Sequence, residues 1–399
     1  MYHIQTLNKI SAAGLKRFDP EHYQVSDSQT NPEGIMVRSA KLLDMDFPSE
    51  LLAIARAGVG VNNIPIERCS EAGIAVFSTP GANANAVKEL VLCAMLIGSR
   101  DIPGALNWVR EQAASGVEVS TVVEKGKSAF VGPEIFRKTL GVVGLGAIGS
   151  LVANAAIQLG MDVYGYDPFL SVDAALRLDH HIHIVKDIRD LYKRSDYVTF
   201  HIHCTDQTRG MVDADAIASM KRGIRVINLA RGEIVQDDAM IPALETGRVA
   251  AYITDFPNNR LLAAPHVVAM PHLGASTPES EQNCAVMAAD ELKDYLETGN
   301  VRNSVNLPAV SMTPSGVMRL CILHKNVPGM LANITTLFGR DGVNVENLSN
   351  KSRGDYAYTI VDLSAPADQC VIDEVTALEN EQTIFTLPSA RYVQGEVAP

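Results

Sequence analysis

Residues 139–149 read TLGVVGLGAIG, a valine-rich apolar run that leads straight into a Gly-x-Gly-x-x-Gly turn. The residues that follow place apolar side chains at helical spacing. A strand, a glycine turn and a helix in this order form the context in which this pattern binds a dinucleotide. We expect Gly144 to allow the tight turn, Gly146 to let the backbone approach a pyrophosphate, and Gly149 to let the helix pack closely on the strand.

A second strand is predicted at residues 162–166, and it ends at Asp167. A carboxylate at this place accepts hydrogen bonds from ribose hydroxyls and repels a 2′-phosphate. The start of the helix adds free N–H groups and a partial positive charge for the phosphates. The sequence therefore predicts a site for NAD rather than NADP.

The whole chain has the composition of a globular protein of roughly two to three domains. Its 399 residues are 47% hydrophobic and 20% charged, with a net charge of −12. This negative charge argues against nucleic acid or an anionic membrane as the main partner. The six cysteines form no Cys-x-x-Cys motif, and no apolar run approaches a membrane span in length. We expect a soluble cytoplasmic protein with reduced thiols.

Repeated strand and helix patterns precede and follow the glycine turn, which is typical of two doubly wound, Rossmann-like α/β domains. The first unit has predicted strands at residues 35–37, 51–55 and 74–77, followed by a buried connecting helix at 84–99. The second has later strands at 197–201, 225–228 and 251–254, with helices near 214–220 and 237–245. A helix at about 278–298 is expected to pack back on the first unit.

The last stretch, about 317–399, changes character. It predicts the order βαββαβ, which is a ferredoxin-like module. Its expected elements are a strand at 317–323, a turn at 324–329, a helix at 330–340, strands at 343–351 and 356–363, a helix at 368–378 and a final strand. We therefore predict a substrate-binding domain at 1–98 with 276–308, an NAD-binding domain at 99–275 and a regulatory domain at 309–399.

Two side chains follow predicted strand ends in the nucleotide-binding part. Arg231 follows the strand at 225–228, where a guanidinium is able to polarise a carbonyl and hold a carboxylate in two-point contact. His272 follows the last strand, where an imidazole serves as a proton donor or acceptor at neutral pH. The alternatives are an ordinary surface arginine and a structural histidine.

Other histidines are weaker candidates. Asp179, His180, His181 and His183 lie close in sequence, but no partner cluster accompanies them, so we expect a solvated loop and no metal site. His201 and His203 alternate on a predicted strand and would share one face; their role is left open.

The glycine turn, Asp167, the NLARG run at 228–232 and the PHLGAST run at 271–277 together resemble the D-isomer-specific 2-hydroxyacid dehydrogenases. The C-terminal module resembles the ACT regulatory domains, and this combination is similar to the branch of the family that oxidises D-3-phosphoglycerate to 3-phosphohydroxypyruvate, the first step of serine synthesis. The resemblance covers nearly the whole chain.

The resemblance implies roles for particular residues. His272 would take the hydroxyl proton while NAD accepts a hydride, and Arg231 would orient and polarise the reacting carbon–oxygen bond. NAD contacts would come from Thr79, Gly144, Gly146, Ala147, Ile148, Gly149, Asp167, Thr205, Ala230, Arg231, Asp255, His272 and Gly274. The substrate would be held by Arg38 and Ser39 at its phosphate and by Gly58, Val59, Gly60 and Asn83 at its carboxylate end.

One position departs from the family pattern. The family places a glutamate partner for the histidine where this chain has Asn259. A neutral amide is able to hydrogen-bond an imidazole but does not stabilise an imidazolium by charge. Either His272 works without a charged partner, or another acid, Asp255 or Glu279, takes the place of the glutamate.

The tail would bind an amino acid, with L-serine as the expected effector. The residues that match the ligand loop and the following strand are His324, Asn326, Gly329 and Asn344. The alternative is that the module only pairs subunits. The resemblance also implies a homo-oligomer, either a dimer or a tetramer.

Two rival functions stay open. One is a hydroxypyruvate or glyoxylate reductase of the same family, against which stand Arg38 and the C-terminal module. The other is a non-enzymatic NAD-sensing protein on the same fold, against which stand Arg231 and His272, because fold alone does not decide function.

Overall fold

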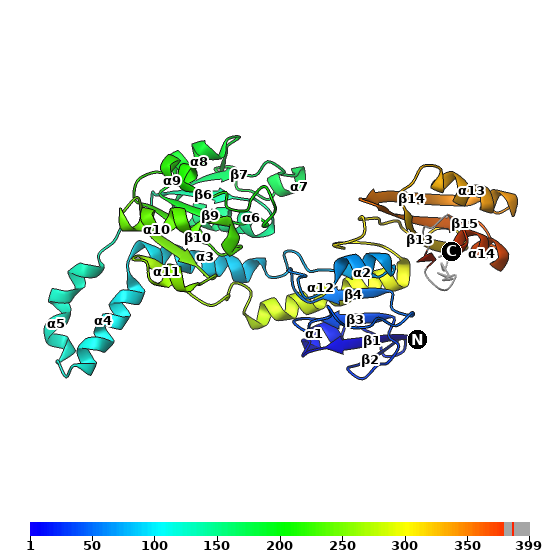
Figure 1. Cartoon of the computed structure of the whole chain (residues 1–399), viewed down its shortest axis with the longest axis horizontal. Helices are drawn as coiled ribbons and strands as arrows, with labels where there is room; N and C mark the ends of the chain where they lie inside the picture. Colours follow the sequence, from blue (N-terminus) through cyan, green and yellow to red (C-terminus); the bar gives the residue numbers. More distant parts are fainter. Residues whose placement is uncertain (379–384, 387–399) are drawn as a thin grey trace. The chain divides into compact units, whose positions relative to one another are not determined.

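The computed structural model describes residues 1–378 and 385–386 (Figure 1). By packing, the chain divides into two units: residues 1–82 with 281–399, and residues 83–280. In the described part of the chain, no helix combines the length and the apolar character that crossing a membrane requires.

The first unit begins with a five-stranded parallel sheet in the order β2-β1-β3-β4-β5. Its strands are β1 (Tyr2–Leu7), β2 (Tyr23–Ser26), β3 (Gly34–Val37), β4 (Ala53–Arg56) and β5 (Ala75–Phe77). The short helices α1 (Ala12–Leu15) and α2 (Ile66–Glu71) connect strands, and α12 is the long helix Pro278–Thr298. This strand order is one of the two common doubly wound arrangements, so the predicted fold of this part is confirmed. The expected strands missed β1 and β2.

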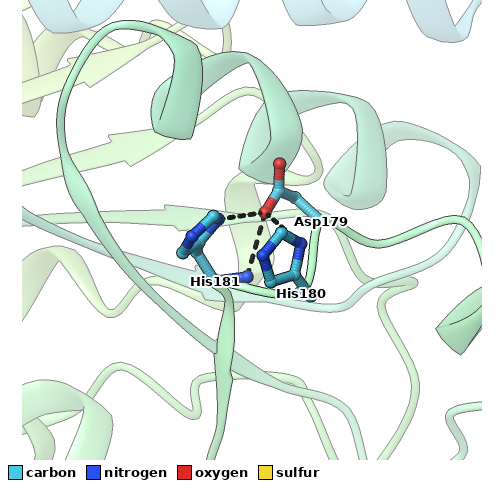
Figure 2. Close-up of side chains that lie close together, drawn as sticks. All are labelled: Asp179, His180 and His181. Carbon is cyan, nitrogen blue, oxygen red and sulfur yellow. Dashed lines mark hydrogen bonds and ion pairs between the residues drawn. The ribbon is translucent and has the colours of Figure 1, made fainter.

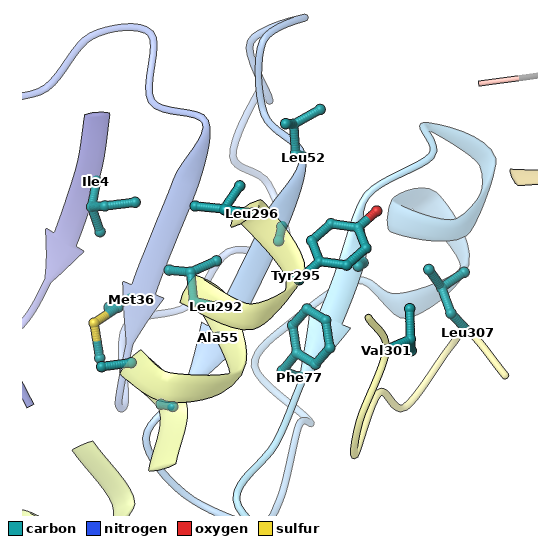
Figure 3. Close-up of a cluster of buried hydrophobic side chains, with 14 of the residues drawn as sticks. Ile4, Met36, Leu52, Ala55, Phe77, Leu292, Tyr295, Leu296, Val301 and Leu307 are labelled. Atoms are coloured by element: carbon teal, nitrogen blue, oxygen red, sulfur yellow. The ribbon is translucent and has the colours of Figure 1, made fainter. Parts of the chain in front are cut away.

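Helix α12 packs on this sheet as predicted. Its Leu292, Tyr295 and Leu296 are at most 2% exposed and lie against side chains of β1, β3 and β4 (Figure 3). Phe77 and the segment around Val301 close the other side of the same cluster. The apolar stripe of α12 therefore joins a segment near residue 300 to the N-terminal sheet.

Glu291 is an exception in the buried face of α12. Its Oε1 accepts a hydrogen bond of 2.6 Å from Asn303 Nδ2, while Oε2 is buried without a partner among the described residues. Burial raises the pKa of Glu291 to about 8; the Asn303 hydrogen bond opposes the rise and Asp290 adds to it. The carboxyl is therefore held in its protonated form at pH values where an exposed glutamate is ionised.

This raised pKa predicts a pH-dependent stability. The folded state holds a proton on Glu291 that the unfolded state releases above about pH 4.5, so the free energy of unfolding falls as pH rises from there to about 8. In Glu291→Gln, which keeps the acceptor oxygen, we expect the melting temperature to fall less over this window than in the parent. Parallel curves from scanning calorimetry would rule this account out.

The second unit holds a seven-stranded parallel sheet in the order β12-β11-β10-β9-β6-β7-β8. Its strands are β6 (Thr139–Val143), β7 (Asp162–Tyr166), β8 (His183–Ile184), β9 (Tyr197–Phe200), β10 (Ile224–Asn228), β11 (Val249–Thr254) and β12 (Val267–Ala269). Its helices include α6 (Ala147–Gln158), α7 (Val172–Ala175), α8 (Ile188–Arg194), α9 (Ala214–Ser219), α10 (Asp237–Glu245) and α11 (Asn259–Leu262). The order reverses at β6, the strand that leads into the glycine turn, which is where such sheets bind ligands.

Helix α3 (Ala84–Ser99) has the predicted bounds but belongs to this second unit. Its buried residues Val87, Val91, Ala94 and Met95 pack in one cluster with α6 and the strands β6 and β11. Residues 83–98, which we assigned to the substrate-binding domain, therefore pack with the nucleotide-binding unit. An apolar face that fits α6 explains this correction.

Helices α4 (Ile102–Ala114) and α5 (Val119–Gly126) project away from the sheet of the second unit (Figure 1). Neither contains a buried residue, although the exposed side chains include Leu106, Val109 and Val123. Trp108 packs on Phe130 of the short helix η1 (Lys127–Phe130) at a ring distance of 5.9 Å. Helices α4 and α5 are therefore stabilised by local contacts such as this ring pair rather than by the main core.

The C-terminal module has the predicted order of elements. Its sheet runs β14-β15-β13-β16, built from β13 (Met318–Lys325), β14 (Val345–Arg353), β15 (Tyr356–Leu363) and β16 (Phe385–Thr386). Helices α13 (Met330–Arg340) and α14 (Gln369–Thr376) pack with one face of the sheet through Ile322, Ile334, Phe338 and Val375. The other face contributes Cys321, Leu323, Tyr358 and Ile360 to the core of the N-terminal sheet and α12. Packing therefore groups this module with the first unit.

One predicted turn is shorter than expected. His324 and Lys325 belong to β13, and His324 is 2% exposed. Its Nδ1 donates to the Lys325 carbonyl at 2.9 Å, and its Nε2 lies 2.9 Å from Thr359 Oγ1, which also accepts from Asn350. The strand β13 extends to these polar residues because the His324 side chain bonds to Thr359 of the neighbouring strand β15.

Candidate functional site

The glycine turn has the geometry that its sequence predicts. Gly144 adopts φ +88°, and a Cβ there would lie 2.5 Å from the carbonyl oxygen of His201. A Cβ on Gly149 would lie 1.8 Å from the Gly144 carbonyl oxygen. Neither position accepts a side chain, so the turn and the close helix–strand contact both require glycine.

Gly146 has a different environment. It is exposed, and a Cβ there would meet no atom within 4 Å. It precedes α6 as the N-cap residue, and no side chain caps the helix. Packing within the protein therefore does not demand glycine at this position, whereas a pyrophosphate bound at the helix start does. Gly146, Ala147 and Ile148 thus fit the dinucleotide.

Asp167 lies directly after β7, as predicted. Its Oδ2 accepts a hydrogen bond of 2.9 Å from the Leu145 backbone N–H, and its Oδ1 accepts one of 2.9 Å from that of Phe169. These bonds fix the carboxylate beside the glycine turn. Each oxygen keeps a second lone pair, which suits the hydroxyls of a ribose.

Arg231 lies in a loop that a buried asparagine holds. Asn228, the last residue of β10, donates from Nδ2 to the Arg231 carbonyl at 2.9 Å and accepts from the Ala230 N–H at 3.2 Å. The half-buried Arg231 donates from Nη1 to the Ala230 carbonyl at 2.7 Å. Asn228 was not among the predicted site residues; its place at a strand end within NLARG was the available signal.

His272 and Asp255 come from the next two strand ends. β10, β11 and β12 are neighbours, and their register pairs Thr254 with both Asn228 and Ala269. Asp255 follows Thr254 and is 1% exposed, while His272 is exposed and packs on the Phe256 ring at 4.8 Å. The sheet thus brings Arg231 and His272 to one edge, as their positions after predicted strands led us to expect. Asp255, which only the family resemblance had indicated, lies between them at the same edge. Phe256 was not predicted.

Burial raises the pKa of Asp255. The His272 ring, the Gly274 backbone N–H and the Arg231 guanidinium oppose this rise by favouring the ionised form. Neither carboxylate oxygen has a hydrogen bond of normal geometry among the described residues. This carboxylate therefore depends on the charges of its two neighbours.

Asn259 is not brought to His272 by any described contact. It begins α11 and is exposed. Its neighbours tie this segment to α10: Asn258 Nδ2 donates to Asp237 at 2.8 Å, and Arg260 pairs with Asp238 at 2.5 Å. These side chains line a cavity of about 510 Å³ together with Gly232 and Phe256.

The other predicted cofactor residues occupy separate places. Ala230 and Gly274 lie at the same sheet edge as Arg231 and Asp255, and Thr205 lies in an exposed turn closed by Thr208. Thr79 belongs to the first unit, where its Oγ1 is buried without a partner among the described residues.

The predicted substrate residues lie mostly in the first unit. Arg38 follows β3, is exposed, and pairs with Glu281 at 2.5 Å, while the Ser39 N–H donates to Asn8. Gly58, Val59 and Gly60 follow the neighbouring strand β4 and are half-buried. Asn83 belongs to the second unit, as the N-cap residue of α3, and its Oδ1 is buried without a partner in the described part of the chain.

Arg56 is a further cation at this edge. β3 and β4 pair Val37 with Arg56, and Arg56 Nε donates to the Arg38 carbonyl at 3.1 Å. Its guanidinium lies close to Gly58: a Cβ on that glycine would be 2.7 Å from Arg56 Nη1. Two arginines at adjacent strand ends fit an anionic group better than Arg38 alone. Arg56 was not predicted as a site residue, because its place beside Arg38 depends on the pairing of β3 with β4, which the sequence does not reveal.

The other histidines considered in the sequence lie in two places. Asp179, His180 and His181 form an exposed turn in which Asp179 Oδ1 accepts from both the backbone and the ring of His181 (Figure 2). Their ligand atoms lie within 4.8 Å of one another, but the three are consecutive residues that satisfy each other. His201 and His203 follow β9 rather than lying in it, so the shared face we predicted is wrong. Burial lowers the pKa of His201 to about 3, which keeps its ring neutral beside Thr199.

Residues 92–274 match the family described as D-isomer specific 2-hydroxyacid dehydrogenase, NAD binding domain. The chain is 33% identical over 344 residues to a D-3-phosphoglycerate dehydrogenase of Synechocystis, covering 84% of this chain and 58% of that protein. It thus spans little more than half the length of this curated relative.

Two solved structures have the same fold. An NAD+-bound 3-phosphoglycerate dehydrogenase of Entamoeba histolytica aligns with a TM-score of 0.59 and 25% identity, over 76% of this chain and 98% of that one. A glyoxylate/hydroxypyruvate reductase of Sinorhizobium meliloti aligns with a TM-score of 0.64 and 22% identity, over 76% and 98%. At that identity the second likeness shows the fold alone.

Proposed function

We propose that this chain, whose residues 92–274 match the family of D-isomer specific 2-hydroxyacid dehydrogenase NAD-binding domains, oxidises D-3-phosphoglycerate to 3-phosphohydroxypyruvate with NAD. The observation that carries this proposal is the meeting of Arg231, Asp255 and His272 at the edge of the sheet that bears the glycine turn. Similarity to the D-3-phosphoglycerate dehydrogenase of Synechocystis supports the substrate. The product would feed L-serine synthesis.

The chemistry divides among few groups. Bound NAD supplies the acceptor for the hydride that leaves C2 of the substrate. His272 takes the hydroxyl proton as the carbon–oxygen double bond forms, and it returns that proton to solvent. Arg231 holds the substrate carboxylate and stabilises negative charge on the reacting oxygen.

The phosphate would be held by groups of the first unit. Arg38 and Arg56 supply two guanidinium groups at adjacent strand ends, and Ser39 adds a hydroxyl. On a chain with a net charge of −12, an anionic substrate needs such a local group of cations. Glu281, which pairs with Arg38, would have to leave it when the phosphate binds.

We propose that the C-terminal module is an ACT-like regulatory domain that binds L-serine. The exposed Asn326 and Gly329 lie at the start of α13, and Asn344 precedes β14. His324 lies in β13 beside this loop, so its role would be to hold Lys325 and the loop in place. Serine regulates only if it binds two arrangements of the protein with different affinity.

Homo-oligomerisation belongs to the same proposal. Helices α4 and α5 bury no residue in their own chain and carry exposed leucine and valine side chains. A second copy is the expected cover, which would make a dimer or, with paired C-terminal modules, a tetramer. All six cysteines are free, which suits the reducing cytoplasm.

The rival functions predict different outcomes in one assay. The full chain is given NAD and D-3-phosphoglycerate, then NADH with glyoxylate or hydroxypyruvate, each with and without L-serine. We expect NADH to form with D-3-phosphoglycerate at a kcat/KM at least about a hundred times that for glycerate, since the phosphate contacts are charge-assisted.

Other outcomes assign the chain elsewhere. Turnover that is fast only with glyoxylate or hydroxypyruvate would make it a reductase. NAD binding without turnover of any 2-hydroxy acid would make it a binding protein. Heat on titration with L-serine is expected, and its absence would reduce the C-terminal module to an assembly element.

A further inference from the structure

The buried carboxylate of Asp255 occupies the centre of the catalytic edge. It follows β11, the strand between β10 and β12, so the loops that carry Arg231 and His272 flank it. Gly274 lies beside it without a side chain: a Cβ there would be 3.6 Å from Asp255 Oδ2. Because Gly274 has no side chain, the loop that carries His272 approaches this carboxylate through its backbone.

Ionising the buried carboxyl of Asp255 is unfavourable in free energy unless a cation lies nearby. An ionised carboxyl that is 1% exposed and lacks normal hydrogen bonds loses its hydration without replacement. The groups that favour its ionised form are first His272, then the backbone N–H groups of Gly274 and of Asp255 itself, then Arg231. Burial raises the pKa of Tyr252 on β11, so its hydroxyl is neutral. The carboxylates of Asp237 and Asp255 both add to this rise in the pKa of Tyr252. The His272 ring is therefore the first of the neighbouring groups that favour the ionised carboxyl of Asp255.

The residues on either side of Asn259, the position where the family has its acid, hold the segment in place. Asn258 and Arg260 bind Asp237 and Asp238 of α10, which fixes the short helix α11 to α10. Asn259 carries no charge, and Glu279 is exposed in α12 with no described contact to His272.

We propose that Asp255 is the acid partner of His272 in this chain, a positioning residue that stabilises the imidazolium formed during oxidation in place of the absent glutamate. The inference rests on the proposed function only for its catalytic meaning. Its electrostatic part, a charge interaction between Asp255 and His272, is expected with or without substrate.

The first test needs no turnover. Full-length protein labelled in its ten histidines is titrated by NMR, with the His272 signal identified by its absence in His272→Gln. We expect Asp255→Asn to move the titration midpoint of that signal to lower pH by about one unit, since loss of a nearby opposite charge destabilises the protonated ring. Asp255→Glu, which keeps the charge, should restore at least half of the shift.

The second test uses the reaction. The acidic limb of the kcat/KM profile for oxidation should move to lower pH in Asp255→Asn by the same amount as the NMR midpoint. Asp238→Asn removes a nearby exposed carboxylate that pairs with Arg260, and it should leave both the midpoint and the limb in place. A fall in activity without movement of either would indicate a purely structural role and overturn the proposal.

Two further results would also overturn it. One is an unmoved midpoint in Asp255→Asn; the other is a shift in Glu279→Gln that equals or exceeds the one in Asp255→Asn. If D-3-phosphoglycerate is not oxidised at all, the proposed function fails, while the NMR titration still decides whether Asp255 and His272 interact.

Discussion

Replacing His272 by glutamine is expected to lower kcat for D-3-phosphoglycerate oxidation by about 1,000-fold, because the reaction then lacks the group that takes the hydroxyl proton. NADH affinity should change by no more than a few-fold, since the glycine turn and Asp167 lie on other strands. Single-turnover kinetics and NADH fluorescence titration separate the two effects. His181→Gln, an exposed histidine outside the site, is the matched control.

The outcome that would contradict this role is specific. If His272→Gln kept more than about a tenth of the parent kcat, a different group would have to accept the proton. If it lost activity and NADH binding together, the residue would be acting through the fold or the cofactor rather than as a base.

Replacing Arg319 by leucine is expected to destabilise the C-terminal module by about 3–5 kcal/mol, because it leaves a buried carboxylate unpaired. Arg319 Nε and Nη2 bind the two oxygens of Asp362 at 2.6 and 2.8 Å, and both side chains are at most 4% exposed. Arg319 Nη1 also donates to the carbonyls of Thr298 and Met312 at 3.0 Å, which ties β13 to the end of α12.

Hydrogen exchange is the appropriate measurement, since a chain of two packing units need not unfold in one step. Amides of β13 and of the end of α12 should both lose protection in Arg319→Leu. Arg340→Leu breaks the exposed pair with Glu374 and should cost no more than about 1 kcal/mol. Loss of protection confined to β13 would show that Arg319 does not couple the module to α12.

The long periodic helices could be predicted from the sequence to the residue. Helices α3, α12 and α13 begin and end where their apolar spacing and flanking residues indicate. The strands β1 and β2 could not be found in this way, because they are short and mix polar with apolar side chains, and only pairing with β3 defines them. The partner of α3 was also beyond the sequence, since an apolar helix shows that it is buried but not against which sheet.

The candidate site follows the same division. Arg231 and His272 were predictable because each follows a strand, and the carboxyl ends of neighbouring parallel strands share one edge. Asp255 was indicated only by the family resemblance. The contribution of Asn228 to the Arg231 loop and the contact of Phe256 with His272 depend on loop conformations that strand-end reasoning does not give. Arg56 required the register of β3 against β4.

The measurement that tests the central claim most directly is the formation of NADH by the full chain from NAD and D-3-phosphoglycerate, with 3-phosphohydroxypyruvate removed as it forms. The account predicts steady turnover that His272→Gln lowers by about 1,000-fold, that Arg231→Ala also lowers, and that glycerate supports at least about a hundred times less efficiently. Absence of NADH formation from a folded protein that binds NAD would contradict it.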